Sequence, residues 1–349
     1  MKQVQHALNS VELSPQQQDR VTTAAQILCE GGIVAFPTET VYGLGADVSN
    51  PIAVRKIYNI KQRPLDHPLI VHISDISQLN YWAQAIPESA WKLAYQFWPG
   101  PLTLILQRSH HVPDSVTGGQ NTVGVRIPAH PIALALLDAL GPGKALAAPS
   151  ANRFGRISPT TAAHVQHELG ATVDMILDGG ACEVGLESTI VYIDNQSVRI
   201  LRPGGITGPE LEMALDMPVN LASTANLYPR ASGLLPAHYA PITPLRMYPA
   251  EQIWQQASTL TAQDLRILIM TWSNTEQLQF SNQLIEHCSM AADPVIYGKQ
   301  LYAKLRHFDQ GAFDYLLIES PPNDPSWLAI ADRLQRASNH SSNKNELSL

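Results

Sequence analysis

The segment VRKIYNIKQRPLDHPLIVH carries the first group of residues whose types suit chemistry, four cations that together could hold an anion. They are Arg55, Lys56, Lys61 and Arg63. Because Pro64 disfavours the α conformation in the residue before it, a helix through residues 53–61 is expected to end there, with Lys61 and Arg63 at its carboxyl end. Cations in that place either complement the helix dipole in water or clamp an anion, and the segment alone leaves both interpretations open.

A second segment, NTVGVRIP, has the residue alternation of a β-strand. Alternation places Val123, Val125 and Ile127 on one face. Thr122, Gly124 and Arg126 are expected on the other. If the apolar face meets the core, Thr122 and Arg126 look outward together. A solvated arginine on an edge strand is the alternative, which this segment taken alone favours.

The third segment is KALAAPSANRFGRISPTTAAHV, in which Pro149 ends an apolar strand. Polar and basic residues follow at once, namely Ser150, Asn152, Arg153 and Arg156. Ser158 or Thr160 is expected to cap the next helix. Backbone N–H groups and hydroxyls at such a strand-to-helix junction favour phosphate oxygens, although ordinary turn and capping chemistry would use the same residues.

Two further strand-like runs, VGLESTIVYI and VRILRPGG, place polar residues at their ends. Ser188 and Thr189 stand at the start of the first run and Arg202 at the end of the second. These residues either belong to an anion site or are only part of a sheet and a turn. The two runs alone leave both interpretations open.

The segment FPTETVYGLG follows the apolar run GGIVAF. Pro37 should end strand pairing, and Thr38 and Thr40, two residues apart, can face the same side. Gly43 and Gly45 would let the backbone approach a ligand or turn tightly. The glutamate between the two threonines either orients a cation or faces solvent.

Composition limits the class of protein. With 349 residues, 45% of them hydrophobic and 15% charged, the chain predicts a folded protein of two domains. The polar N-terminus lacks a signal peptide and no run is long enough to span a membrane, which favours a cytoplasmic address. Three dispersed cysteines and an adjacent pair of histidines suggest no metal site. A net charge of -7 argues against coating nucleic acid, so any anion site should be local.

The elements that must position these residues form two groups. Helical patterns alternate with short β-rich runs over residues 20–206, which predicts an α/β domain with a mixed sheet. Residues 207–243 are rich in Pro, Ala, Ser and Thr and read as a linker with one short helix early on. A second, smaller α/β unit follows, and the closing residues are polar enough to be disordered.

Taken in order, the motifs resemble those of the YrdC/Sua5 family, the L-threonylcarbamoyladenylate synthases. They are FPTETVYGLG, KQRPLDHPLIVH, FWPGPLTLIL, VGVRIPAHP, APSANRFGRISPT and GLESTIV…ILRPGG. HYAP at 238–241 and the pattern LYAKLRHFD…LLIES…AIADRLQRAS resemble the longer Sua5 form.

The sequence departs from the family pattern at two places. The linker of the family more often has Ser-Pro-Gly at its start and a basic residue before HYAP, and His67 stands where Asn or Lys is commoner.

The resemblance implies a specific α/β architecture. Residues 12–206 would form a YrdC-like catalytic domain, a twisted mixed sheet with helices around a concave basic pocket. Residues 207–243 would be a linker that covers the active site, residues 244–337 a smaller Rossmann-like Sua5 domain, and residues 338–349 a disordered tail.

The resemblance also implies a nucleotidyltransferase. L-threonine, ATP and bicarbonate would give threonylcarbamoyl-AMP, pyrophosphate and water, the first step of the N6-threonylcarbamoyl modification of adenosine 37 in tRNA. Mg2+ would come with ATP, without a dedicated protein site. The product would pass to the tRNA threonylcarbamoyl transferase machinery, with a weak tRNA contact and no membrane. The alternative is an RNA- or nucleotide-binding module without catalysis.

The family's site residues carry over by position. The catalytic tetrad falls on Lys61, Arg63, Ser150 and Asn152. The threonine-binding residues fall on Thr38, Thr40, Arg63, His72, Thr122, Arg126 and Ser188. The ATP-binding residues fall on Lys61, Arg63, Ser150, Asn152, Ser158, Arg202 and the linker residue Tyr239.

Overall fold

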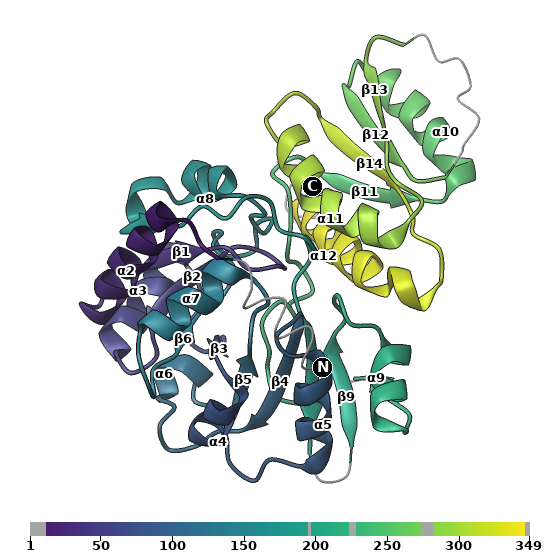
Figure 1. The fold of residues 1–349 in the computed structure, drawn as a ribbon. Helices are drawn as coiled ribbons and strands as arrows, with labels where there is room; N and C mark the ends of the chain where they lie inside the picture. Colours follow the sequence, from purple (N-terminus) through teal and green to yellow (C-terminus); the bar gives the residue numbers. More distant parts are fainter. Residues whose placement is uncertain (1–11, 195–196, 223–227, 274–281, 346–349) are drawn as a thin grey trace. The chain divides into compact units, whose positions relative to one another are not determined.

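The computed structural model describes residues 12–194, 197–222, 228–273 and 282–345, and the chain forms two compact units (Figure 1). Unit 1 contains the chain up to Phe154 together with Ser158–Leu234. Unit 2 contains Gly155–Ile157 and the chain from Leu235 onward. Three residues from within the first half of the sequence thus belong to the second unit.

Within the described residues, unit 1 is built on a ten-stranded mixed sheet with the order β10-β9-β8-β4-β5-β3-β6-β2-β1-β7. The strands are β1 (Val34–Phe36), β2 (Gly43–Asp47), β3 (Ile70–His72), β4 (Leu102–Gln107), β5 (Thr122–Arg126), β6 (Leu146–Ala147), β7 (Met175–Ile176), β8 (Thr189–Ile193), β9 (Val198–Arg202) and β10 (Asn220–Leu221). Strands β3 and β5 pair in parallel, whereas β4 and β5 are antiparallel. The mixed α/β sheet predicted from the strand spacing is confirmed.

Helices cover this sheet on both faces. They are α2 (Pro15–Cys29), α3 (Pro51–Lys61), α4 (Leu79–Trp82), α5 (Glu88–Phe97), α6 (Asp114–Thr117), α7 (Pro131–Ala139), α8 (Ala162–Glu168) and α9 (Gly208–Leu215), with short 3-10 turns at Ile76–Gln78 and Gly170–Thr172. Side-chain alternation along β1 divides the core: Ala35 joins the larger cluster, and Val34 and Phe36 pack under α2 and α7. Burying a side chain such as Phe36 stabilises the fold by about 1.5–3 kcal/mol.

Across β3, β4, β8 and β9, the described segment 228–234 packs on one face of the sheet, which we call the open sheet face. A small apolar cluster lies there, made by Ile70, Ile105, Ile190, Leu201 and Ala231. Ala231 belongs to the segment 228–234, which lies along this face. The polar residues that end these strands therefore lie beside a face on which segment 228–234 packs.

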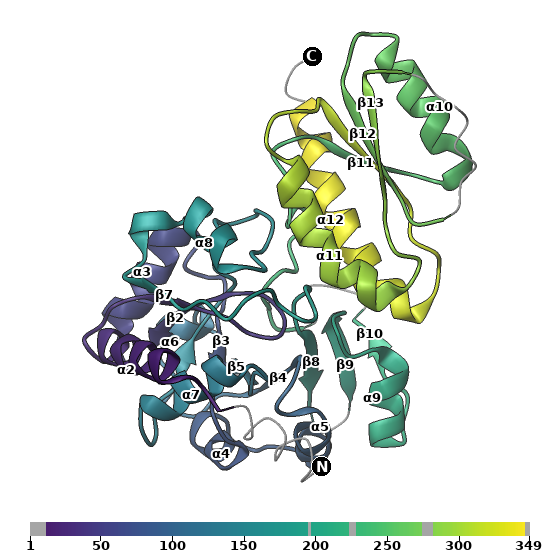
Figure 2. The same ribbon diagram turned by 45° about the horizontal axis from the view of Figure 1, so that its top comes forward.

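Unit 2 has a four-stranded sheet in its described residues, with the order β11-β14-β12-β13 and parallel pairing throughout. Its strands are β11 (Leu245–Tyr248), β12 (Ile267–Thr271), β13 (Ile285–Ser289) and β14 (Tyr315–Glu319). Its helices are α10 (Ala250–Thr261), α11 (Pro294–Phe308) and α12 (Leu328–Asn345), with a 3-10 turn at Pro325–Trp327. Figure 2 shows α10 on one side of this sheet and α11 and α12 on the other, the Rossmann-like layering predicted for the smaller unit.

The boundaries between the units differ in detail from those expected. The segment 207–243, expected to be a linker, begins with the predicted short helix, α9, and then forms β10, which pairs with β9 of unit 1. Helix α12 continues to Asn345, into the tail expected to be disordered, and residues 346–349 lie outside the described residues. No helix among the described residues is both long and apolar enough to cross a membrane.

Candidate functional site

The turn after β1 holds the two threonines of FPTETVYGLG. Pairing ends at Phe36, as Pro37 predicts, and the Oγ1 atoms of Thr38 and Thr40 lie 2.8 Å apart, so the two hydroxyls do face the same side. Thr38 Oγ1 donates to the Val41 carbonyl oxygen at 2.6 Å and accepts from the Thr40 backbone N–H. Thr38 thus shapes the turn, whereas the Thr40 hydroxyl also accepts a hydrogen bond from Arg126.

The glycines of the same segment serve packing. Gly43 and Gly45 lie in β2, and a Cβ atom on either would come within about 3 Å of the Phe36 ring (3.0 and 2.9 Å). The expectation of a tight turn at these positions is therefore wrong, whereas a close approach of the backbone to a ligand stays a prediction. Their small size lets the strand pass the ring, because an aromatic side chain fills the space that a Cβ would take.

Arg126 lies at the end of β5, on the face opposite the core residues Val123 and Val125, as the strand alternation predicts. Its Nη2 lies 2.5 Å from Glu39 Oε1, and its Nη1 donates to Thr40 Oγ1 at 2.9 Å. Only 5% of the Arg126 side chain and 7% of the Glu39 side chain is exposed. Two roles were left open for Glu39, orienting a cation or facing solvent, and the structure supports the first. The charge-assisted pair is stronger than a neutral hydrogen bond.

His72 is the strand neighbour of Arg126, since the two residues are opposite one another in the β3–β5 pairing. The ring is buried, with Nδ1 3.2 Å from the Ile70 carbonyl oxygen. Burial, and secondly the charge of Arg126, lowers the pKa of His72 to about 3. His72 is therefore a neutral hydrogen-bonding group at neutral pH.

Lys61 ends α3, as predicted, and the next residue, Gln62, takes the left-handed conformation (φ 55°) that stops the helix. The buried Nζ of Lys61 donates to the Ser150 carbonyl oxygen at 2.6 Å and to the Asn152 carbonyl oxygen. Burial, and secondly the charge of Arg63, holds the pKa of Lys61 well below its usual value. Lys61 thus fixes the backbone of the loop that carries the other half of the predicted tetrad.

Arg63 and Arg202 share one neighbour, Ser232. Arg63 Nη2 donates to Ser232 Oγ at 3.2 Å and to the Pro68 carbonyl oxygen at 3.0 Å. Arg202 Nη1 donates to the Ser232 carbonyl oxygen at 3.0 Å, and its Nη2 donates to Ser188 Oγ at 3.1 Å. Two predicted cations from distant parts of the sequence therefore meet at one point of the open sheet face.

Thr122 and Ser158 complete the predicted set in unit 1. Thr122, partly buried, lines a cavity of about 10 Å³ between the sheet face and residues 230–232, room for about one water molecule. Ser158 is fully buried and donates its hydroxyl hydrogen to Glu187. It does not cap α8; Thr161 does, by accepting from the His164 backbone N–H.

Tyr239 lies in unit 2, where its ring is 1% exposed. It stacks on Tyr302 with ring centroids 5.9 Å apart and lies under the guanidinium of Arg333 at 5.0 Å. A contact of Tyr239 with ATP stays a prediction.

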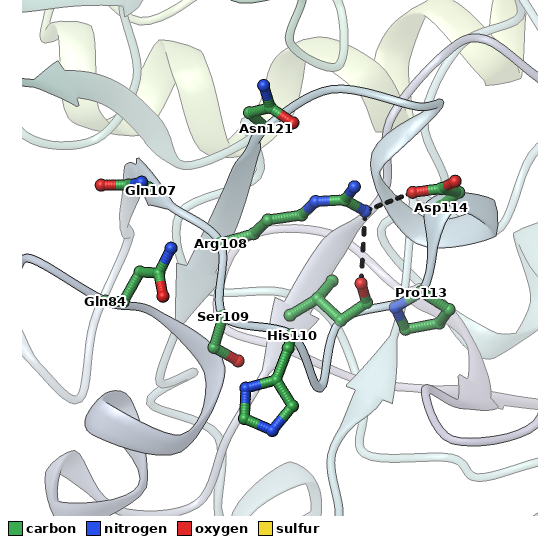
Figure 3. Close-up of a pocket in the computed structure, with 9 residues that line it drawn as sticks. Gln84, Gln107, Arg108, Ser109, His110, Pro113, Asp114 and Asn121 are labelled. Carbon is green, nitrogen blue, oxygen red and sulfur yellow. Dashed lines mark hydrogen bonds and ion pairs between the residues drawn. The ribbon is translucent and has the colours of Figure 1, made fainter.

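An open pocket of about 500 Å³ lies elsewhere in unit 1, around the end of β4 (Figure 3). Its lining is polar and includes Gln84, Gln107, Arg108, His110, Asp114 and Asn121. Arg108 points to Asp114, with Nη1 2.5 Å from Oδ1 (Figure 3). No predicted site residue lines this pocket.

Sequence reasoning missed three partners of the predicted residues: Glu187, Thr103 and Ser232. Thr103 Oγ1 lies 2.8 Å from Ser188 Oγ, on the neighbouring strand β4. Only Ser232 had a visible signal, since the linker departs from the family pattern beside it. Among the described residues, no group of three or more His, Cys, Asp and Glu side chains is placed to hold a metal ion.

The fold is that of an α/β protein whose buried guanidinium groups are of a kind that suits anionic ligands, and the comparisons with known proteins define its family. The chain belongs to the Sua5/YrdC family. A family model covering Sua5, YciO and YrdC, described as "Telomere recombination", matches residues 26–204, and "Threonylcarbamoyl-AMP synthase, C-terminal domain" matches residues 206–339. The second match identifies the long Sua5 form.

Individual relatives agree over nearly the whole chain. The threonylcarbamoyl-AMP synthase of Bacillus subtilis is 40% identical over 324 residues, covering 91% of this chain and 92% of the relative. That of Pyrococcus abyssi is 36% identical over 340 residues, covering 92% and 94%. A crystal structure of P. abyssi Sua5 complexed with L-threonine matches with a TM-score of 0.83 at 35% identity, covering 93% of this chain and 95% of that one.

Proposed function

We propose that this chain is a threonylcarbamoyl-AMP synthase, which joins L-threonine, bicarbonate and ATP into threonylcarbamoyl-AMP with release of pyrophosphate and water. The observation that carries the proposal is that Arg63, Arg126 and Arg202 are all buried in unit 1. Each donates a hydrogen bond to a hydroxyl group, that of Ser232, Thr40 and Ser188 respectively. Buried guanidinium groups of this kind suit carboxylate and phosphate oxygens. Relatives of nearly full length bear this name, and one is described with L-threonine bound.

The threonine half of the proposed site is the group around Arg126. Arg126 would take the carboxylate of the amino acid, and Thr40 would offer a hydroxyl to it or to the threonine side chain. His72, neutral at neutral pH, adds a polar group without adding charge. Thr38, Thr122 and Ser188 complete this half as hydrogen-bonding residues.

The nucleotide half is the group around the loop that follows β6. Arg63 and Arg202 would bind phosphate oxygens, and Ser150, Asn152 and Ser158 would position the nucleotide. Lys61 acts on this loop through the carbonyls of Ser150 and Asn152, which makes it a positioning residue in the structure as it stands. Tyr239 would reach the nucleotide from the linker.

The proposed chemistry depends on bringing together partners that repel one another. The threonine amine attacks bicarbonate and water leaves, which gives a carbamate. A carbamate oxygen then attacks the α-phosphorus of ATP, and pyrophosphate departs with the electron pair of the broken bond. Fixed guanidinium groups in a site of low dielectric would offset the repulsion and hold the reacting atoms in line, so no protein nucleophile is required.

Mg2+ would arrive on the triphosphate, where it would neutralise charge on the departing pyrophosphate. The cationic residues of the proposed nucleotide half suit phosphate oxygens rather than a metal ion, so the metal would be held chiefly by the nucleotide.

Segment 228–234 would act as part of the cover of the site. Ser232 accepts one hydrogen bond from each of the two guanidinium groups that are assigned to phosphate, and it would give way when ATP binds. Closure of the linker afterwards would keep water from the carbamate. The product would pass to the tRNA threonylcarbamoyl transferase machinery, with a weak tRNA contact.

The test is an assay of pyrophosphate release with each substrate omitted in turn, with the nucleotide product identified by mass spectrometry. Release that requires threonine, bicarbonate and ATP together, with threonylcarbamoyl-AMP formed in equal amount, is expected. A protein that binds RNA or nucleotide without catalysis would release none, and that result would refute the proposal.

A further inference from the structure

Gly155–Ile157 is the one part of the first half of the chain that belongs to unit 2 among the described residues. The residues on both sides belong to unit 1, and they include Asn152 before it and Ser158 after it. Both flanking residues are assigned to the nucleotide half of the proposed site. The loop that would hold ATP therefore runs out of unit 1, through unit 2 and back.

Unit 2 holds the middle of this segment by a charge pair. Arg156 Nη2 lies 3.0 Å from Asp309 Oδ2, and the Asp309 side chain is only 6% exposed. The same carboxylate accepts from the backbone N–H groups of Ile242 and Thr243, each at 2.8 Å. Asp309 follows directly on α11, where its backbone N–H caps the helix by donating to Leu305. The carboxylate is thus held in place by rigid structure and is largely shielded from water.

The other two residues of the segment are held as well. The Ala240 backbone N–H donates to the Gly155 carbonyl oxygen at 2.9 Å, and the Arg306 guanidinium donates to the Ile157 carbonyl oxygen. Residue 155 has φ +79°, a conformation that glycine adopts without strain. Each residue of Gly155–Ile157 therefore has its own contact with the rest of unit 2, and helix α11 and its end supply two of these contacts.

We infer that Asp309 is a positioning residue for the nucleotide: by fixing Arg156 it sets the conformation of the loop between Asn152 and Ser158. This inference rests on the proposed function and adds to it a role for the second domain. The segment is three residues long and a residue spans at most about 3.3–3.6 Å, so a shift at Arg156 passes directly to both flanks. Displacements of about 1 Å in positioning groups are large enough to cost up to about 10²-fold in rate.

A competing interpretation is that Arg156 binds phosphate itself and that Asp309 only balances its charge. The two interpretations predict opposite effects of removing the carboxylate charge. If Arg156 were a phosphate ligand, Asp309→Asn would free it and ATP would bind more tightly. If Asp309 positions the loop, the same change weakens ATP binding.

The experiment compares the full-length variants Asp309→Asn and Arg156→Gln with the matched control Asp293→Asn. Asp293 carries the same side chain at the other end of α11, where it caps the helix, and asparagine caps equally well. Pyrophosphate release is measured with ATP varied at saturating threonine and bicarbonate, and then with threonine varied at saturating ATP. We expect Asp309→Asn and Arg156→Gln each to raise KM for ATP about tenfold, with KM for threonine within about twofold of wild type.

The double variant separates positioning from general damage. Because both changes break one interaction, Asp309→Asn with Arg156→Gln should raise KM for ATP no further than either alone, and Asp309→Glu should recover part of the loss. If the wild type is active and Asp309→Asn leaves KM for ATP unchanged or lowers it, the inference is overturned. The proposed function would then still stand. Multiplied effects in the double variant overturn it too. A wild type that forms no threonylcarbamoyl-AMP overturns both.

Discussion

The two halves of the proposed site are built differently. Around Arg126, the side chains of Glu39 and Thr40 close a buried hydrogen-bonded group that the sheet and the turn after β1 hold in place. Around Arg63 and Arg202, the partners come from loops, among them Ser232 from the segment along the open sheet face. The threonine half is therefore preorganised, while the nucleotide half depends on how its loops are held.

This difference fits the chemistry of the two ligands. A small amino acid offers few groups to bind, so its site gains most from a guanidinium already oriented by a carboxylate. ATP is larger and its product must leave as an adenylate, so movable segments around the phosphates allow both steps. The two halves should accordingly respond differently to mutation.

Arg126→Gln should have the largest effect, because it breaks the preorganised half and leaves Glu39 buried without its cation. We expect a loss of about 3–5 kcal/mol in the free energy of unfolding and on the order of 10³-fold in turnover. Urea unfolding and pyrophosphate release measure the two losses. The double variant Glu39→Gln, Arg126→Gln should regain most of the stability and none of the activity; a single variant as stable and active as wild type would contradict the assignment.

Lys61→Met should loosen the nucleotide half, because the Ser150 and Asn152 carbonyls lose their shared donor. We expect turnover at fixed ATP to fall on the order of 10²-fold, with the Kd for threonine unchanged. The matched control is Lys56→Met on the same helix, where the ammonium binds the Gly31 carbonyl instead. Weaker threonine binding in the Lys61 variant would show that the two halves are not separable.

Acid should weaken the threonine half through His72. Its pKa in the folded state is about 3, below an unfolded value of about 6.5, so the unfolded chain binds more protons and stability falls as pH drops below about 6.5. Between pH 7 and pH 5, wild type should lose about 2 kcal/mol more than His72→Gln, which does not titrate. Urea unfolding at the two pH values measures this, and equal losses in the two proteins would rule the histidine out as the cause.

Ser232→Ala should have the smallest effect. The hydroxyl competes for Arg63, and a single hydrogen bond is worth about 0.5–1.5 kcal/mol, so KM for ATP should fall by about two- to tenfold. Steady-state kinetics with varied ATP provide the measurement. A KM that instead rises tenfold would mean that this serine binds the nucleotide rather than giving way to it.

Local rules predicted much of the framework from the sequence. The period of two along β5 placed Arg126 opposite Val123 and Val125, and Pro64 marked the end of α3. Both features depend on neighbours in the chain, which a single sequence displays. The strand β10, by contrast, is only two residues long and forms because β9 offers a free edge, which no local pattern reports.

The site was harder to predict because its contacts join distant segments. The Glu39–Arg126 pair spans 87 positions and the Arg63–Ser232 contact 169, so the sequence showed both ends of each contact without showing the pairing. The two glycines of FPTETVYGLG misled for a related reason, since the ring that demands their small size is a packing neighbour across the β1–β2 pairing.

The contrast between the two halves is tested most directly by calorimetric titration of L-threonine into the nucleotide-free protein. Because Glu39 and Thr40 hold Arg126 before any ligand arrives, threonine should bind without ATP, with a Kd within about threefold of that for the Lys61→Met variant. The same titration into Arg126→Gln should show no binding. Threonine that binds wild type only after a non-hydrolysable ATP analogue is added would contradict a preorganised threonine half.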